Sequence, residues 1–214
     1  MDPRQPLPDT GDRVPVSTSP EDDGVKRPSP VFVLYLAATI VAGFAALAWA
    51  SLTYPIWPTI SLTQAGGREG ILLGVVFWML LGLLGGMRVQ HMRGHGVLTF
   101  HLPFIIAATA LGGPVAGGWV AVVATFEVRE LRGDVPWYGT LSNHAALALS
   151  AVLAGVALDV VQNGLLRGVT DQVEAAQLVA IIGATLVLSL VSSGLAAGVV
   201  MLRDGLSARE TRRL

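Results

Sequence analysis

The sequence predicts an all-α integral membrane protein, and three observations support this fold class. Hydrophobic residues make up 52% of the 214 residues and charged residues only 14%, against about 25% charged residues in soluble domains. The apolar residues come in long runs rather than at the spacing of an amphipathic helix. Several runs approach the length of about 20 residues that a helix needs to cross the bilayer core. The chain is therefore expected to cross a membrane several times.

About six transmembrane segments are expected. The first, second, fifth and sixth cover residues 31–52, 70–87, 141–158 and 175–202. The apolar stretch 97–126 is interrupted by Gly112-Gly113-Pro114, and a proline after two glycines ends one helix and lets the chain reverse. This pattern predicts a Gly-Gly-Pro helical hairpin as segments three and four. The hairpin consists either of two thin crossings or of one re-entrant loop.

Two tails are expected to flank the membrane domain of residues 31–202. Residues 1–30 are rich in Pro, Asp and Ser, so they bury too little apolar surface to offset their chain entropy and are expected to be disordered. A signal peptide cleaved near Ala48-Trp49-Ala50 is disfavoured, because six acidic residues against four basic ones precede the apolar run. Residues 203–214 form a short basic tail.

The distribution of basic residues predicts that both tails are cytoplasmic. If the hairpin begins and ends on one side of the membrane, twelve of the 14 Lys and Arg residues share the side of the termini, and only Arg68 and Arg167 lie opposite. The positive-inside rule assigns the richer side to the cytoplasm. The loop EVRELRGD, residues 127–134, then lies in the cytoplasm, where its charges are expected to reach water. An Arg-rich, Lys-poor composition suggests a GC-rich bacterial genome, so the expected location is the bacterial inner membrane.

Small residues on two segments are expected to be helix-packing positions. Ala38, Ala42 and Ala46 recur every fourth residue on the first segment, and Gly194 and Gly198 form a GxxxG motif on the sixth. Such positions let helix backbones approach closely in lipid. Packing within the chain is the favoured interpretation, and docking of a partner helix or a homodimer is the alternative.

Few residues suggest chemistry. His91, His95 and His101 have a spacing that could serve a metal, but no carboxylate lies between Arg88 and Phe126 to complete the ligands, so neither a metal nor another cofactor is expected. Hydrolase, P-loop and HExxH signatures are missing, which indicates that the chain is not an enzyme. The net charge of −1 gives no reason to expect a nucleic-acid partner. Asn143, His144 and His101 are the candidate ligand-binding residues.

The stretch from about residue 94 to 155 resembles a known family. It runs GVLTFHLPFIIAATALGGPVAGG and then RELRGDVPWYGTLSNHAALALSAVLAG, which is similar to the MASE-like multi-pass sensory regions of bacterial cyclic-di-GMP signalling proteins with GGDEF or HD-GYP output domains. The matching positions are Gly113, Pro114, Arg132, Pro136, Trp137, Tyr138 and Asn143. The resemblance implies a signal-input module that couples a membrane or periplasmic cue to a cytoplasmic output. Its expected partners, besides the lipid bilayer, are a second copy of the chain or a cytoplasmic or membrane signalling partner.

Two features depart from that family pattern. Ser142 precedes Asn143 where the family usually has an aromatic residue, and the chain stops at RDGLSARETRRL without an output domain. The chain is accordingly expected to be either a free-standing relative or a fragment of a longer protein. The alternative resemblance is to the S-components of energy-coupling-factor vitamin transporters, in which the first-helix stripe of Ala38, Ala42 and Ala46 would dock a membrane partner.

Overall fold

The computed structural model describes residues 29–63, 67–87, 90–92, 96–98, 101–127, 130, 132–133, 136–165 and 173–204. Residues 1–28 and 205–214 lie outside this part of the chain, so the expected disordered and basic tails fall almost entirely outside the described residues. Within it, five helices are long and apolar enough to cross a membrane. The prediction of a multi-pass α-helical membrane protein is thus confirmed, although these helices number five rather than six.

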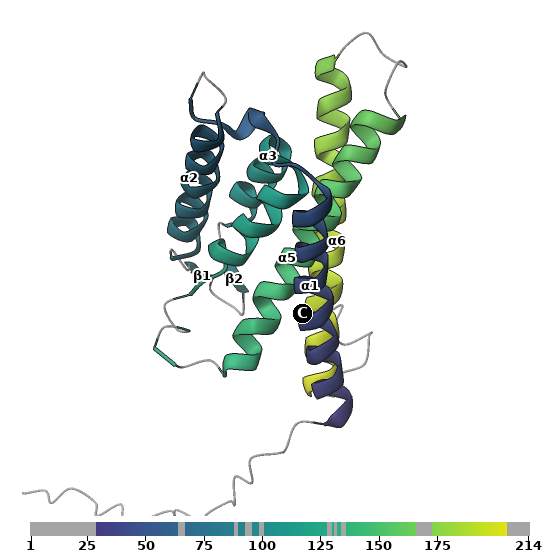
Figure 1. Cartoon of the computed structure of the whole chain (residues 1–214). Coiled ribbons are helices and arrows are strands. Elements are labelled where there is room, and N and C mark those ends of the chain that lie inside the picture. The colour runs from purple at the N-terminus through teal and green to yellow at the C-terminus, as the bar shows by residue number, and fades with distance from the viewer. Residues whose placement is uncertain are drawn as a thin grey trace, which may run out of the picture.

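The elements follow one another in a simple order (Figure 1). The long helices are α1 (Pro30–Thr53), α2 (Arg68–Met87), α3 (Leu102–Ala124), α5 (Trp137–Asp159) and α6 (Val173–Asp204). A 3₁₀ turn, η1 (Pro58–Ile60), precedes α2, and a π-helical turn, η2 (Val160–Leu165), follows α5. A short antiparallel hairpin of β1 (Gln90–Met92) and β2 (Gly96–Leu98) joins α2 to α3 and was not predicted.

Local chemistry explains where α1 begins and ends. The Ser29 side chain accepts a hydrogen bond from the Phe32 amide at 3.2 Å, and Pro30 occupies the first helical position, where its missing N–H costs nothing. The helix ends at Thr53 because Tyr54 precedes Pro55, and a residue before proline disfavours the helical conformation. Apolar hydropathy alone had predicted this helix to within a residue at each end.

Helix α3 is broken at Gly113, whose φ of 76° and ψ of −169° are not helical. Beyond the break the chain folds back: a Cβ on Gly117 would lie 3.2 Å from the Cα of Thr109, and a Cβ on Gly82 of α2 would meet both Phe104 and Ala124. The break leaves backbone carbonyls at the tip, and the segment after α1 satisfies them. The Trp57 amide donates to the Gly112 carbonyl at 3.2 Å, and the Thr59 hydroxyl donates to Leu111.

Helix α5 is the centre of the bundle. It packs against α1, α3 and α6, while α2 covers the other side of α3 (Figure 1). Two glycines allow the closest approaches, because a Cβ on Gly43 of α1 would collide with the Ala145 backbone and one on Gly155 of α5 with Pro114 at the α3 tip. The end of the bundle where α1 begins and α6 ends is called the basal end below; η1 and η2 lie at the other, distal end.

The expected packing positions are only partly correct. Ala38 and Ala42 are exposed and Ala46 is half-buried, while α1 buries a different face, made of Leu36, Thr39, Gly43, Leu47 and Ala50. The prediction that Ala38 and Ala42 pack against other helices of the chain is therefore wrong. On α6, Gly198 packs against the Tyr35 ring, whereas no atom lies within 4 Å of a Cβ built on Gly194.

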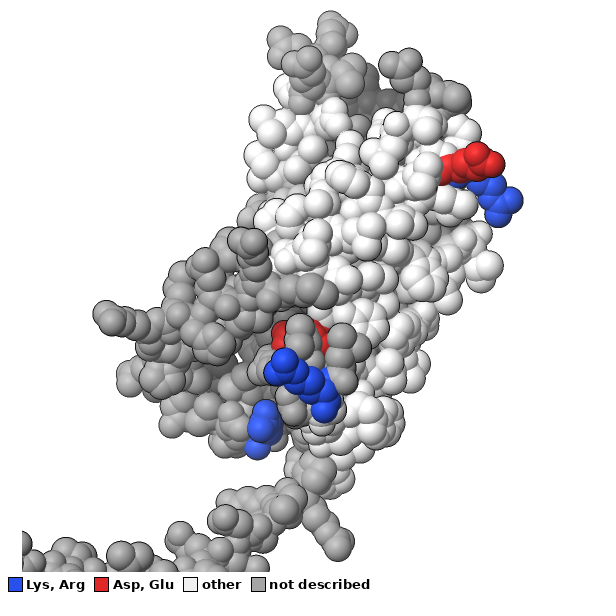
Figure 2. Space-filling view, turned by 90° about the vertical axis from the view of Figure 1, so that its left-hand side faces the viewer, with Lys and Arg blue, Asp and Glu red and all other residues white. Residues whose placement is uncertain are grey.

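The described charged side chains gather at two levels of the molecule, with a broad uncharged band between them (Figure 2). Large apolar side chains are exposed on the long helices, including Val41 of α1, Leu80 of α2 and Leu190 of α6. Exposed apolar surface of this extent fits contact with lipid. The outer faces of α1, α2 and α6 are thus those expected of helices in a bilayer.

Candidate functional site: a basal cavity beside a buried histidine–glutamate pair

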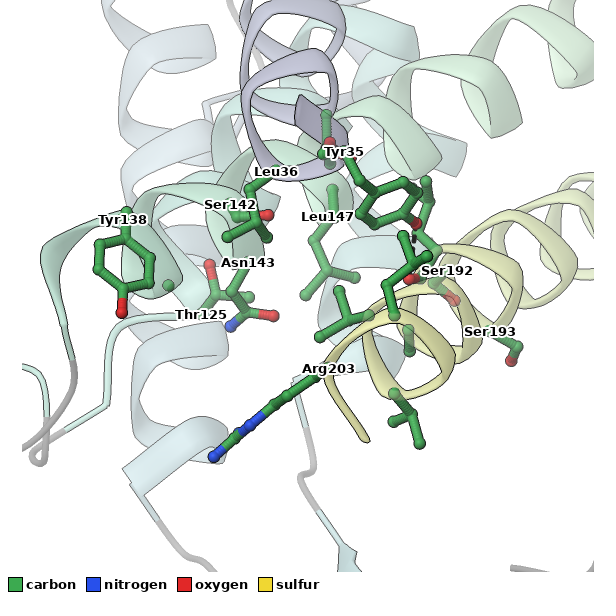
Figure 3. Close-up of a pocket in the computed structure, with 18 of the residues that line it drawn as sticks. Tyr35, Leu36, Thr125, Tyr138, Ser142, Asn143, Leu147, Ser192, Ser193 and Arg203 are labelled. Carbon is green, nitrogen blue, oxygen red and sulfur yellow. Dashed lines mark hydrogen bonds between the residues drawn. The ribbon is translucent and has the colours of Figure 1, made fainter. Parts of the chain in front are cut away.

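A cavity of about 1100 Å³ lies at the basal end of the bundle. Its walls come from the first turns of α1, Gly86 near the end of α2, both ends of α3, the first half of α5 and the last three turns of α6 (Figure 3). Its volume is at the upper end of the range of about 300–1,000 Å³ usual for ligand sites. The cavity therefore lies where parts of all five long helices meet.

One hydrogen bond joins the two outer walls of the cavity. The Tyr35 hydroxyl of α1 donates to the Leu195 carbonyl of α6 at 2.8 Å, and the Tyr35 ring lies against Gly198. The absence of a side chain at Gly198 leaves room for the ring. Tyr35 therefore couples α1 to α6 beside the cavity.

Most inner hydroxyls of the cavity are already bonded to backbone. Thr39 donates to the Tyr35 carbonyl at 2.9 Å and Ser192 to the Ser189 carbonyl at 3.2 Å. By contrast, Ser142 and Asn143 on α5 make no side-chain hydrogen bond with any described residue. Figure 3 shows these two side chains on the α5 wall, with Ser192 and Arg203 on the α6 wall.

Three titratable side chains complete the lining. Glu127 and Arg203 carry opposite charges, and each already interacts with other groups of the chain. Burial lowers the pKa of His101 below its ordinary value of 6.5, and the Glu127 carboxylate opposes this shift. His101 therefore favours its neutral form at the edge of the cavity.

His144 directly follows Asn143 but does not line the cavity, and it is buried in a hydrogen-bonded cluster. Its Nδ1 lies 2.6 Å from the Val122 carbonyl and 2.7 Å from the Thr125 hydroxyl, and its Nε2 lies 3.1 Å from Oε2 of Glu130. The side chains of His144 and Glu130 are only 4% and 7% exposed. The Phe126 ring lies over the imidazole, with 4.4 Å between ring centroids.

The partners of His144 determine where its protons are. A carbonyl oxygen can only accept, so Nδ1 carries a hydrogen, and the Thr125 hydroxyl is free to accept as well because it donates to the Ala121 carbonyl at 2.8 Å. The Nε2–Oε2 contact then needs one further proton, on either the imidazole or the carboxyl group. The pair therefore forms either an ion pair or a neutral hydrogen bond, and both fasten the loop after α3 to α5.

The structure separates the three candidate ligand-binding residues. His101 and Asn143 line the cavity, whereas His144 is not part of its lining and is held by the loop. The prediction that the charges of EVRELRGD reach water is wrong for Glu130. Its side chain is buried, and its carboxylate forms hydrogen bonds with His144 and with the Glu127 amide. It is correct for Arg132, which is exposed.

The other motif positions fall at two places. Gly113 and Pro114 form the buried tip of α3, and Pro136 and Tyr138 line the cavity, while Trp137 is exposed. Of the expected histidine group, His95 lies outside the described residues. Within the described part of the chain, no three His, Asp or Glu residues come together to hold a metal.

Sequence reasoning missed Glu130 and Thr125 as partners of His144. The only indication in the sequence was that the polar pair Asn143-His144 lies near the start of an apolar helix, after a charged loop. The two residues are 14 positions apart and do not lie on one continuous helix, so helical periodicity could not predict that they meet.

The chain was compared with protein families, curated proteins and solved structures. No protein-family model matches the chain, and neither the curated proteins nor the solved structures contain a significant match.

Proposed function

We propose that the chain is a membrane-embedded signal-input module, in which occupation of the basal cavity changes the position of α6 relative to α1. The observation that carries this proposal is the cavity itself, which is lined by the start of α1 and the end of α6. These are the first and the last of the long helices in the described part of the chain. A ligand that prefers one spacing of α1 and α6 shifts the population toward it.

The contact between α1 and α6 is suited to such a change. Beside the cavity they meet through the Tyr35–Leu195 hydrogen bond and the packing of Tyr35 on Gly198. One such bond contributes only about 0.5–1.5 kcal/mol. A ligand can therefore change this contact at the basal end of α6, while the core residues of α6 nearer the distal end, Ala180, Ala184 and Leu188, stay packed.

The two arms of α3 support a re-entrant hairpin in this proposal. Gly113 divides the 23 residues of α3 into arms of 11 on each side, and 11 helical residues span only about 16 Å. The hydrocarbon core is about 30 Å thick. The hairpin would enter from the basal side and turn back within the bilayer, with its tip covered by η1.

The basal end is cytoplasmic in this proposal, and the membrane is a bacterial inner membrane. The basic residues of the sequence favour this orientation. The resemblance to MASE-like sensory regions supports an output related to cyclic-di-GMP, since five of its seven motif positions fall on the α3 tip or on the cavity wall.

Two experiments test the signalling function. Reading the gene beyond the codon for Leu214 should reveal a GGDEF or HD-GYP domain; a stop codon there, beside genes for transporter ATPases, would count against the proposal. In cells that express the whole gene, Tyr35→Phe should change the cyclic-di-GMP concentration severalfold, because it removes the hydrogen bond between α1 and α6 while the ring stays on Gly198.

Tyr54→Phe is the matched control, because Tyr54 lies at the distal end of α1 and its hydroxyl has no hydrogen bond to a described residue. Equal cyclic-di-GMP levels in wild type and both variants, at equal protein amounts, would overturn the coupling of α1 to α6.

A second candidate function is an S-component-like subunit of a vitamin-type transporter. The exposure of Ala38 and Ala42 on α1 favours it, since a face of small residues is free for a membrane partner. Replacing both by Leu would then abolish uptake by the assembled transporter while the isolated chain keeps its melting temperature. Uptake that is unchanged in this double variant would exclude the candidate.

A further inference from the structure

Four polar side chains that line the basal cavity have no side-chain hydrogen bond to a described residue: Tyr138, Ser142 and Asn143 on α5, and Ser193 on α6. Only Ser142 and Asn143 are adjacent in sequence. Thr39, Ser192 and Tyr35 are occupied by backbone carbonyls, at 2.9, 3.2 and 2.8 Å. Ser142 and Asn143 have no such partner among the described residues. A hydroxyl and a carboxamide can each donate and accept, so a ligand head placed here finds both kinds of group.

The surroundings of these two residues are apolar. Leu36 of α1, Leu147 of α5 and Ala196 and Val199 of α6 line the cavity between its polar groups. Such walls accept hydrocarbon, but they do not attract it out of a bilayer, because lipid tails are equally apolar. Selectivity among membrane molecules therefore depends on the polar contacts that the head group of a ligand makes in the cavity.

The charges of the lining favour a head without net charge. Glu127 and Arg203 have opposite signs, and both already interact within the chain. A charged head would lose its hydration and would be attracted by one of these residues while being repelled by the other. The lining side chains without an internal hydrogen bond, Tyr138, Ser142, Asn143 and Ser193, all carry neutral hydroxyl or amide groups.

We propose that the basal cavity binds a neutral single-chain amphiphile, with an uncharged oxygen-bearing head at Ser142 and Asn143 and its hydrocarbon chain between α1, α5 and α6. This inference deepens the proposed function and rests on the same cavity. The ligand class comprises long-chain alcohols and monoacylglycerols, which reach the cavity from the bilayer.

The test uses the whole chain in phosphatidylcholine nanodiscs. A photoreactive 1-monooleoylglycerol is added at low mole fraction, and its attachment sites are mapped by mass spectrometry. Labelling should concentrate on cavity residues of α1, α5 and α6 rather than on the exposed face of α2. Unlabelled 1-monooleoylglycerol should compete, oleate should compete at least about tenfold more weakly because its head is charged, and glycerol should not compete.

Two variants test where the head group and the hydrocarbon chain of the ligand bind. Asn143→Ala should weaken binding about fivefold, the loss expected for about one hydrogen bond, while Asn163→Ala at the distal end should leave it unchanged. Ala146→Trp fills the cavity and should abolish labelling of its walls. Melting temperatures of both cavity variants show whether the fold is kept, and Asn143, being exposed, should tolerate replacement.

The outcomes separate this inference from the proposed function. Labelling spread evenly over lipid-facing residues, competition by oleate equal to that by monooleoylglycerol, or equal binding by Asn143→Ala would overturn the ligand class or its placement. If the probe binds in the cavity but cyclic-di-GMP does not respond to Tyr35→Phe, the signalling function fails and the binding site stands. If cyclic-di-GMP responds and the probe does not bind, the ligand assignment fails alone.

Discussion

The imidazole Nε2 of His144 on α5 lies 3.1 Å from a carboxyl oxygen of Glu130 in the loop that follows α3, and both side chains are buried. Loss of one partner of a buried pair leaves the other without compensation, which costs about 3–5 kcal/mol. His144→Ala should therefore strongly lower the apparent melting temperature in detergent.

Glu130→Gln is the matched variant for this pair. A glutamine amide can donate to a neutral Nε2 while Nδ1 keeps its hydrogen bond to Val122. Its melting temperature should fall much less than that of His144→Ala. Equal losses in the two variants would contradict the arrangement in which one proton is shared between Nε2 and the carboxyl group.

Gly113→Ala should destabilise the α3 tip for two reasons. Residue 113 has a φ of 76°, which L-residues adopt at a cost of about 1–2 kcal/mol, and a Cβ would lie 2.8 Å from the Trp57 ring. Thermal unfolding should show a clear loss. Gly67→Ala is the control, because nothing lies within 4 Å of its Cβ and its φ is not positive, and a loss of equal size there would contradict this explanation.

Gly43→Ala should separate α1 from α5. Its Cβ would collide with the Ala145 backbone, which cannot rotate away as a side chain can, and overpacking of this kind costs about 1–3 kcal/mol. Gly183→Ala on α6, where a Cβ meets no atom within 4 Å, should leave the melting temperature unchanged or raise it slightly. The prediction fails if Gly43→Ala is as stable as Gly183→Ala.

His101 should contribute to a loss of stability in mild acid. Because burial lowers its pKa below 6.5 in the folded chain, the unfolded chain binds a proton first, and stability falls as the pH drops through about 6.5. The melting temperature of His101→Gln should change less between pH 7.5 and 5.5 than that of the wild type. An identical pH dependence of both proteins would show that His101 is not the group responsible.

Reporter fusions test the orientation of the bundle. A fusion at residue 133, in the loop at the basal end, should report the cytoplasm, and one at residue 167, after η2, should report the opposite side. Alkaline phosphatase and a fluorescent protein give complementary signals at each position. The same side for both fusions would overturn the proposed topology.

The sequence by itself determined that this is a membrane protein, where its long helices lie and where α3 breaks. These properties are local: an apolar run of sufficient length forms a helix in lipid, and Gly113-Pro114 interrupts a helix whatever surrounds it. The expected segment 175–202 thus agrees with α6 to within two residues at each end. The α5 start was less accurate, since residues 137–140 were assigned to the loop.

Only the tertiary structure decided which faces pack and which side chains meet. In a bilayer the outside of a helix is as apolar as its inside, so hydropathy does not distinguish the exposed Ala42 from the buried Gly43. The pairing of Glu130 with His144, and the position of Asn143 on the cavity wall beside α6, depend on how loops and helices distant in sequence are brought together. Close packing at Gly43 and Gly155 fixes that arrangement, and with it the cavity.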